Sequence, residues 1–269
     1  MSIVAIVGKA GSGKDTIANH LTQEHGFAQI ALADPLKRYA QKVFRFSEDQ
    51  LWGPSHLRNE EDVRFGVDAH DILDSSDAWV ATFARAKAFN ATWVREVLPS
   101  SGLLIDMATH NLGTWLSDLR ESKEPLSPRS VLQSLGTEWG RALRDTIWLD
   151  HCLLVAGKIQ QGSFTYMKTK GPQYDPTVTG TPVVISDVRF ANELEAIKNA
   201  KGYLIKVNRP NAGLEVSFAQ HASEQEQEGF DDEMFNLIVN NNSTIENLLH
   251  TVDLAATVIT RPSNRPLKF

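Results

Sequence analysis

A lysine that follows three closely spaced glycines is the feature of this sequence with the clearest chemistry. Residues 8–16 read GKAGSGKDT, so that Gly8, Gly11 and Gly13 precede Lys14. Glycines let successive backbone N–H groups turn toward one anion, and a lysine at this spacing reaches the β- and γ-phosphates of a nucleotide. We therefore predict that this loop binds a triphosphate.

The residue after the lysine departs from the usual pattern of such loops. A serine or threonine that holds magnesium normally stands there, whereas this chain has Asp15, with Thr16 one position later. A carboxylate beside a polyphosphate is repelled unless a cation lies between the two groups. We therefore expect Asp15 to face Mg²⁺, directly or through a water molecule.

The segments on either side of the loop have the periodicity of a strand and of a helix. The apolar run SIVAIV at residues 2–7 precedes the loop, and residues 14–25 carry helical apolar spacing. A helix that starts at the loop adds partial positive charge at its N-terminus, where an anion binds. Strand, glycine loop, lysine and helix thus stand in the order that a nucleotide-binding loop requires.

A second strand is predicted at residues 28–32, followed by a helix, in the segment AQIALADPLKR at residues 28–38. Asp34 suits the N-cap of this helix and Pro35 its first position, which places Lys37 and Arg38 in the first turn. Open α/β sheets bind ligands at the carboxyl ends of their strands, and this turn lies just beyond such an end. Lys37 is therefore a candidate phosphate ligand, with a solvated surface position as the alternative.

Two arginines follow in the segment LWGPSHLRNEEDVR at residues 51–64. The planar guanidinium groups of Arg58 and Arg64 suit bidentate contact with a phosphate. The alternative is that both arginines pair with the acidic residues between them, which are Glu60, Glu61 and Asp62. The composition of the segment leaves both interpretations open.

The segment SPRSVLQSLGTEWGRALR, which begins at Ser127, supplies more cations than any other. Ser127 is predicted to cap a helix, with Arg129 in its first turn and Arg141 and Arg144 near its end. Phosphoryl transfer needs cations around the migrating group, and these arginines could provide them, although ordinary solubilising charge is the alternative. Gly136 within a helix costs about 1 kcal/mol relative to alanine, which indicates the close approach of a ligand or a partner backbone.

Three further apolar runs complete the predicted core, at residues 183–187, 203–208 and 235–240. The first ends in Asp187, with Arg189 two positions later, and a carboxylate at a strand end is how phosphate-loop enzymes orient magnesium or its waters. Five apolar strands with intervening helices predict an α/β fold with a parallel five-stranded sheet that is flanked by helices. The ligand cleft is expected at the carboxyl ends of these strands.

We interpret residues 1–269 as a single domain with one insertion. Residues 71–126 are predicted to be an inserted helical section, because apolar residues recur there at helical spacing and place the tryptophans on helix faces, where they pack. Residues 162–182 are rich in glycine, threonine and proline and are predicted to form a flap or a long loop. Residues 261–269, with two prolines, are interpreted as a loose tail.

Composition restricts the partners and the compartment. The 269 residues are 42% hydrophobic, which is enough for a full core, and the net charge of −6 argues against a long nucleic acid as a partner. The single cysteine, Cys152, excludes an internal disulfide and favours a reducing compartment. No membrane-spanning run or charged leader is evident, so a cytoplasmic protein is expected, and a homodimer is left open.

Taken together, the motifs resemble those of one known family. GKAGSGKDT, ALADPLK, LWGPSHLRNEED, SPRSVLQSLGTEWGR and VVISDVRFANE, with later NRP and HASE, occur in the order found in bacteriophage deoxynucleoside monophosphate kinases. The resemblance implies a nucleoside-monophosphate-kinase fold of the P-loop type and ATP-dependent phosphorylation of a deoxynucleoside monophosphate, such as dGMP or dTMP. A phage-encoded enzyme of this kind would act in the host cytoplasm. The resemblance does not extend to residues 71–122.

The resemblance also implies roles for individual residues. ATP would be held by Gly11, Ser12, Gly13, Lys14, Asp15 and Thr16. The monophosphate side would be formed by Lys37, Arg58, Arg129, Gly136, Thr137, Trp148, Asp187 and Arg189. We hypothesise that Lys14 serves the donor together with Mg²⁺, which Asp15 and Asp187 would face. Arg129, with Arg141 or Arg144, would clamp the acceptor and the transferring group.

Two other classes of protein stay open at this point. A small-molecule kinase of the phosphomevalonate kinase type shares a GKD-like loop and a strand that ends in DVR, but it is not expected to carry SPRSVLQSLGTEWGR. A non-catalytic nucleotide-binding switch would bind ATP and would have little use for a second site lined by cations.

Overall fold

The computed structural model describes residues 2–9, 11–66, 73–99, 102–164, 177–210 and 229–260, without the side chains of residues 73–77. The chain divides into two compact units, one formed by residues 1–32 and 152–269 and the other by residues 33–151. Most of the predicted flap and the whole predicted tail lie outside the described residues. Among the helices that are described, none combines the length and the apolar character needed to cross a membrane.

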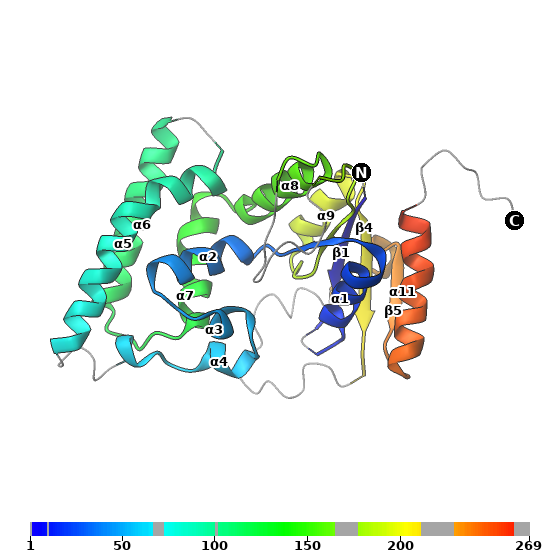
Figure 1. The fold of residues 1–269 in the computed structure, drawn as a ribbon, viewed down its shortest axis with the longest axis horizontal. Helices are drawn as coiled ribbons and strands as arrows, with labels where there is room; N and C mark the ends of the chain where they lie inside the picture. Colours follow the sequence, from blue (N-terminus) through cyan, green and yellow to red (C-terminus); the bar gives the residue numbers. More distant parts are fainter. Residues whose placement is uncertain are drawn as a thin grey trace, which may run out of the picture. The chain divides into compact units, whose positions relative to one another are not determined.

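The first unit is built around a five-stranded parallel sheet (Figure 1). Its strands are β1 (Ile3–Val7), β2 (Ala28–Ile30), β3 (Val183–Ile185), β4 (Tyr203–Asn208) and β5 (Leu237–Asn240). They lie in the order β2-β3-β1-β4-β5, and every neighbouring pair is parallel. The predicted parallel five-stranded sheet is therefore confirmed, and the carboxyl ends of its strands share one edge.

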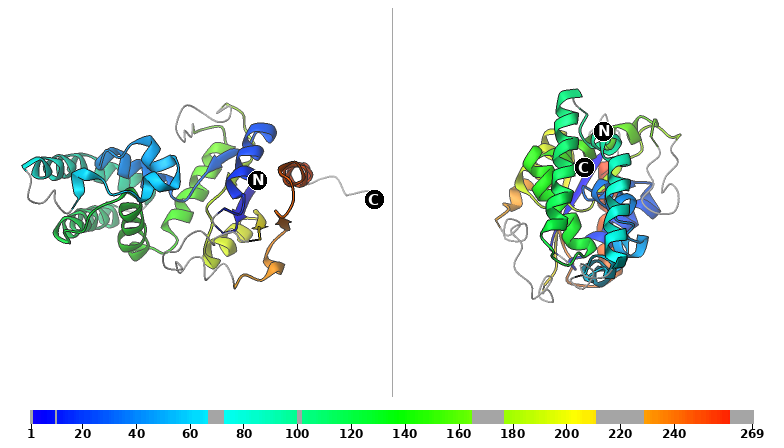
Figure 2. Two further views of the ribbon diagram at one scale, coloured as in Figure 1. Left: turned by 90° about the horizontal axis from the view of Figure 1, so that it is seen from below. Right: turned by 90° about the vertical axis from the view of Figure 1, so that its left-hand side faces the viewer.

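Helices cover this sheet on both faces, so that all five residues of β1 are buried. Helices α1 (Lys14–His25) and α11 (Ile245–Ile259) pack against each other, and their apolar side chains join one core cluster with those of the strands. Helix α9 (Ala191–Asn199) packs against β1 and β4 (Figure 2). The core cluster includes Val4, Ile6, Ile17, Leu21, Phe27, Ile205, Leu248 and Val252.

The second unit is helical. Its elements are α2 (Asp34–Val43), α3 (Glu48–Trp52), α4 (Ser55–Asn59), η1 (Val63–Phe65), α5 (Leu73–Val97), α6 (Gly102–Glu121), α7 (Pro128–Ser134), the π-helix η3 (Leu135–Arg141) and the start of α8 (Ile147–Gln160). Helix α5 packs against both α2 and α6. The predicted insertion is thus helical over α5 and α6 (Figure 1).

Tryptophans form much of the core of this helical unit. Trp79, Trp93, Trp115 and Trp139 are all at most 6% exposed, and the rings of Trp93 and Trp139 lie 5.2 Å apart, centroid to centroid. Such contacts between large aromatic rings stabilise a core beyond the area that they bury. The interpretation of the tryptophans as packing residues is therefore confirmed.

The N-cap predicted for the first helix of this unit was wrong. Ala33 is the N-cap of α2, and Asp34 is already the first helical residue. The buried carboxylate of Asp34 accepts a hydrogen bond from Trp52 Nε1 at 3.4 Å instead of capping the helix. A partner from a neighbouring helix thus competes with the local capping bond.

The segment from Ser127 to Arg144 also differs from the single α-helix that the sequence predicted. It is α-helical for two turns and then continues as a π-helix. Ser127 caps α7 as predicted, since its hydroxyl accepts a hydrogen bond from Ser130 N at 3.1 Å. Beyond α7, the indole of Trp148 donates to the carbonyl of Gly136 at 2.9 Å and lies directly against Gly140. A side chain thus bonds to a backbone carbonyl within the π-helix, and departures from α-helical pairing commonly accompany such contacts.

Candidate functional site

The glycine loop leaves the carboxyl end of β1 and opens helix α1. Gly11 and Gly13 adopt left-handed backbone conformations, with φ of 74° and 106°, and Gly13 is the N-cap of α1. A Cβ atom on Gly13 would lie 2.7 Å from Asn241 Nδ2, and L residues rarely adopt the backbone conformation found there, so glycine is favoured at this position. Among the described residues, no side chain caps α1, and unpaired amides in the first turn of a helix are groups that bind an anion.

The side chains of this loop have the properties that a phosphate site requires. Lys14 Nζ lies 2.5 Å from the carbonyl oxygen of Gly8 and 2.7 Å from that of Lys9, at the mouth of the loop. Asp15 and Thr16 follow in the first turn, and the carboxylate of Asp15 is exposed. The hydroxyl of Ser12 is buried and has no hydrogen-bond partner among the described residues. A nucleotide phosphate would satisfy such a group.

Two residues support the loop that the sequence had not identified as part of the site. Arg209 Nη1 donates to the carbonyl of Gly11 at 3.0 Å, and Asn241 Nδ2 donates to the carbonyl of Ser12 at 2.9 Å. Arg209 follows β4 directly, and Asn241 follows β5. Their position at strand ends was the available signal, because that edge of a parallel sheet carries the ligand site.

Asp187 lies at the same edge of the sheet, two residues beyond the end of β3. Its Oδ1 atom accepts a hydrogen bond from the backbone N–H of Leu32 at 2.8 Å, which ties the ends of β3 and β2 together. Arg189 is exposed, and its backbone N–H donates to the carboxylate of Glu193 at 2.8 Å. Strand β3 pairs with β1, and the glycine loop follows β1. Asp187 and the glycine loop therefore follow the ends of neighbouring strands.

In the helical unit, three predicted cations lie on helices that pack together. Helix α7, which carries Arg129 in its first turn, contacts both α2 and α4, which carry Lys37 and Arg58. Lys37 Nζ lies 5.6 Å from the ring centroid of Trp52. Arg58 Nη1 donates to the carbonyl of Leu51 at 2.9 Å, and Arg129 is exposed. A shared packing arrangement of this kind can concentrate positive charge for an anionic ligand.

Arg64 is engaged differently from Arg58. Its Nε and Nη2 atoms bind the two carboxylate oxygens of Asp62, each at 2.8 Å. Burial opposes ionisation of Asp62, but the hydrogen bonds from Arg64 and Gln50 outweigh it and hold the pKa of this carboxyl below its usual value. The pairing alternative therefore applies to Arg64, and the assignment of Arg58 to a phosphate remains a prediction.

The remaining predicted residues lie on or beside the π-helix η3. Gly136 is buried, and a Cβ there would lie 3.3 Å from Leu36, the neighbour of Lys37. Thr137 is exposed on the same turn. Trp148 is 5% exposed and contacts η3 through its indole, so any role in binding would be exerted through that backbone.

The two arginines at the end of this segment differ in their surroundings. Arg141 is the last residue of η3 and is half-buried. Arg144 lies beyond the π-helix and forms an ion pair with Asp150, with Nη2 and Oδ2 2.9 Å apart. Both arginines therefore remain candidates for a phosphate clamp with Arg129.

The strand order and the glycine loop define a P-loop α/β protein, which is the class of the nucleoside monophosphate kinases. A family model described as deoxynucleotide monophosphate kinase matches residues 2–252. A protein of Acanthamoeba polyphaga mimivirus, named "Putative deoxynucleotide monophosphate kinase", is 26% identical over 247 residues, which cover 91% of each chain. This chain belongs to the deoxynucleotide monophosphate kinase family.

Membership of this family makes the protein a kinase that uses a nucleotide as phosphoryl donor and a nucleotide monophosphate as substrate. The enzyme class expected from the motifs is therefore confirmed. The match also favours this activity over the phosphomevalonate-type kinase and the non-catalytic switch.

Proposed function

We propose that the protein transfers the γ-phosphoryl group of ATP to a deoxynucleoside monophosphate, such as dGMP or dTMP, to form the diphosphate. The observation that carries this proposal is the loop at the carboxyl end of β1, where left-handed glycines and the start of α1 present amides beside Lys14. This arrangement suits the β- and γ-phosphates of a nucleoside triphosphate.

On the donor side, we assign Gly11, Ser12, Gly13, Lys14 and Thr16 to the phosphates of ATP. The exposed carboxylate of Asp15 and the strand-end carboxylate of Asp187 would supply oxygen ligands of the kind that Mg²⁺ prefers. Bound magnesium supplies charge neutralisation at the phosphate oxygens. Lys14 adds a second positive charge, and the loop amides orient the triphosphate.

On the acceptor side, we assign Lys37, Arg58 and Arg129 to the monophosphate, because their helices pack together. Gly136 and Thr137, which lie on the π-helix, would contact the nucleotide. The hydrogen bond from Trp148 to the carbonyl of Gly136 would hold that backbone in place. Arg129, with Arg141 or Arg144, would neutralise the charge that spreads over the oxygens of the transferring group. Arg189 is assigned to the monophosphate.

In the proposed reaction, the protein forms no covalent bond to either substrate. An oxygen of the acceptor phosphate attacks the γ-phosphorus in line while the bond from the γ-phosphorus to the bridging oxygen of ADP breaks. Rate enhancement then comes from positioning the two nucleotides and from compensating negative charge.

A coupled assay of ADP release across the deoxy- and ribonucleoside monophosphates tests the proposal. We expect ATP- and Mg²⁺-dependent turnover with at least one deoxynucleoside monophosphate, and none with phosphomevalonate. ADP release that is independent of every monophosphate, or that occurs with phosphomevalonate alone, would overturn the assignment. Replacement of ATP by other triphosphates in the same assay measures the choice of donor.

A further inference from the structure

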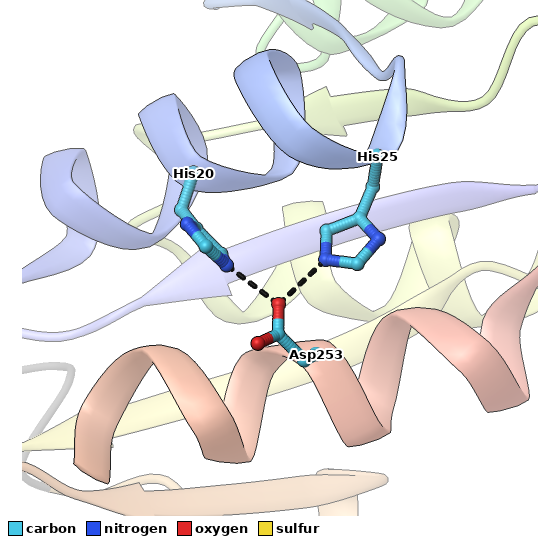
Figure 3. Close-up of side chains that lie close together, drawn as sticks. All are labelled: His20, His25 and Asp253. Carbon is cyan, nitrogen blue, oxygen red and sulfur yellow. Dashed lines mark hydrogen bonds and ion pairs between the residues drawn. The ribbon is translucent and has the colours of Figure 1, made fainter. Parts of the chain in front are cut away.

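Two histidines and an aspartate meet on the helices that cover one face of the sheet, outside the residues assigned above. His20 and His25 lie on α1, and Asp253 lies on α11 (Figure 3). The Nε2 atoms of His20 and His25 are 2.6 and 2.7 Å from the same oxygen, Oδ1 of Asp253. These three atoms all lie within 4.8 Å of one another.

This donor set is one that transition metals prefer. Two imidazole nitrogens and a carboxylate oxygen bind Zn²⁺ at about 2.0–2.2 Å, and a water can complete the tetrahedron. Neighbouring donors in such a tetrahedron are about 3.4 Å apart. A metal would therefore require each Nε2 atom to move away from Oδ1 by less than about 1 Å, and the two Nε2 atoms, which lie within 4.8 Å of each other, to reach the same spacing. Rotation of the side chains is sufficient for a change of that size.

The surroundings of the cluster allow an ion to enter. The side chains of His20, His25 and Asp253 are 15%, 24% and 46% exposed, so the cluster is accessible to solvent. Their backbones are held in helices α1 and α11. His20 and His25 each donate a hydrogen bond through Nε2 to Oδ1 of Asp253. A bound metal would displace these two protons, so that each imidazole coordinates through Nε2 and keeps its proton on Nδ1.

We propose that His20, His25 and Asp253 bind one divalent transition-metal ion, Zn²⁺ in preference to Mg²⁺, and so link α1 to α11. Nitrogen donors favour zinc over magnesium, which selects oxygen ligands. The role is structural, because His25 ends α1 about 16 Å along the helix from Lys14, which begins it. The ion fixes the helix that starts at the glycine loop against the helix that follows β5 and Asn241.

The direct test is a metal titration of the full chain without a polyhistidine tag and in the presence of excess Mg²⁺. We expect one equivalent of Zn²⁺ to bind, and Co²⁺ to give the visible absorption of a four-coordinate site. At zinc concentrations about 100 times Kd, the thermal midpoint of unfolding should rise by about 5 °C or more.

Matched variants locate the ion. His25→Gln and Asp253→Asn should each lower zinc affinity by more than about tenfold. His110→Gln removes an exposed histidine from α6 and should bind zinc as the wild type does. Zinc binding that survives both cluster substitutions, or a wild-type protein that binds no zinc and gives no cobalt spectrum, would overturn the proposal. Zinc binding and the cobalt spectrum are both measured without ADP release. The metal site and the kinase reaction are therefore tested independently of each other.

Discussion

At the scale of single residues, the two phosphate sites proposed above would use different chemistry. Backbone amides of a glycine loop and one lysine would provide the donor side, and side-chain cations on packed helices would provide the acceptor side. Backbone amides are fixed once the loop is folded, whereas each guanidinium must be held by its own contacts. Each of these assignments can be tested by a single substitution.

Lys14→Ala should lower kcat by about 100-fold or more, because it removes a preorganised positive charge from the transferring phosphate. Steady-state turnover with ATP measures the loss. Lys198→Ala, an exposed lysine on α9, is the matched control and should keep wild-type activity. If Lys14→Ala kept full turnover and an unchanged thermal midpoint, Lys14 would not be part of the donor site.

Arg58→Ala and Arg64→Ala should fail in different ways. Arg58→Ala should raise the KM for the monophosphate by about tenfold or more, because it removes a charge-assisted contact. Arg64→Ala should mainly lower the thermal midpoint, because it leaves the buried carboxylate of Asp62 without its bidentate partner. If Arg64→Ala raised KM and Arg58→Ala lowered the thermal midpoint, Arg64 would be the phosphate ligand and Arg58 the structural residue.

Asp62 should make the stability of the protein depend on pH below about 4. Its pKa is lower in the folded state than in the unfolded chain, so its contribution is present above the unfolded pKa of about 3.9 and is lost as pH falls through the folded value. Asp62→Asn should therefore cost about 1–3 kcal/mol at pH 7 and flatten the acid dependence. Urea unfolding of both proteins at several pH values measures the difference, and parallel pH profiles would contradict it.

At the scale of elements, the π-helix η3 is the feature that sets this protein's helical unit apart from a simple bundle. Its backbone carries Gly136, Thr137 and Arg141, and the indole of Trp148 holds it at Gly136. π-Helical turns are rare and are frequently found at functional sites. The tight contact between Trp148 and Gly140 fixes where this segment lies.

Two glycine substitutions should have opposite effects on stability. A Cβ at Gly140 would overlap the indole of Trp148, so Gly140→Ala should lower the free energy of unfolding by about 1–3 kcal/mol. A Cβ at Gly113, within α6, would meet nothing within 4 Å, so Gly113→Ala should raise it by about 0.5–1 kcal/mol. Chemical denaturation of the two variants gives both values. A tolerated alanine at position 140 would mean that the contact with Trp148 is not required.

At the scale of the whole molecule, the chain combines a nucleotide-binding sheet unit with a helical unit, each with its own core. Direct transfer of a phosphoryl group requires both nucleotides to be bound at once. We therefore expect initial-rate measurements to give intersecting double-reciprocal plots. Parallel plots would indicate a phosphorylated enzyme intermediate and would contradict direct transfer.

Local patterns in the sequence were enough to predict the sheet, the glycine loop and the helix that the loop opens. A run of β-branched residues and a fixed spacing of glycines act through their own backbone, so their consequences can be read without knowledge of distant segments. The strand boundaries were less exact, since β2 ends at Ile30 and β5 begins at Leu237.

Only the tertiary structure decided which side chains meet across long stretches of chain. Arg209 and Asn241 reach the glycine loop from β4 and β5, and Asp253 reaches histidines that precede it by more than 220 residues. The hydrogen bond from Trp148 to the carbonyl of Gly136 in the π-helix likewise joins residues 12 positions apart. Packing determines such contacts, because side chains from distant segments become neighbours only when the core has formed.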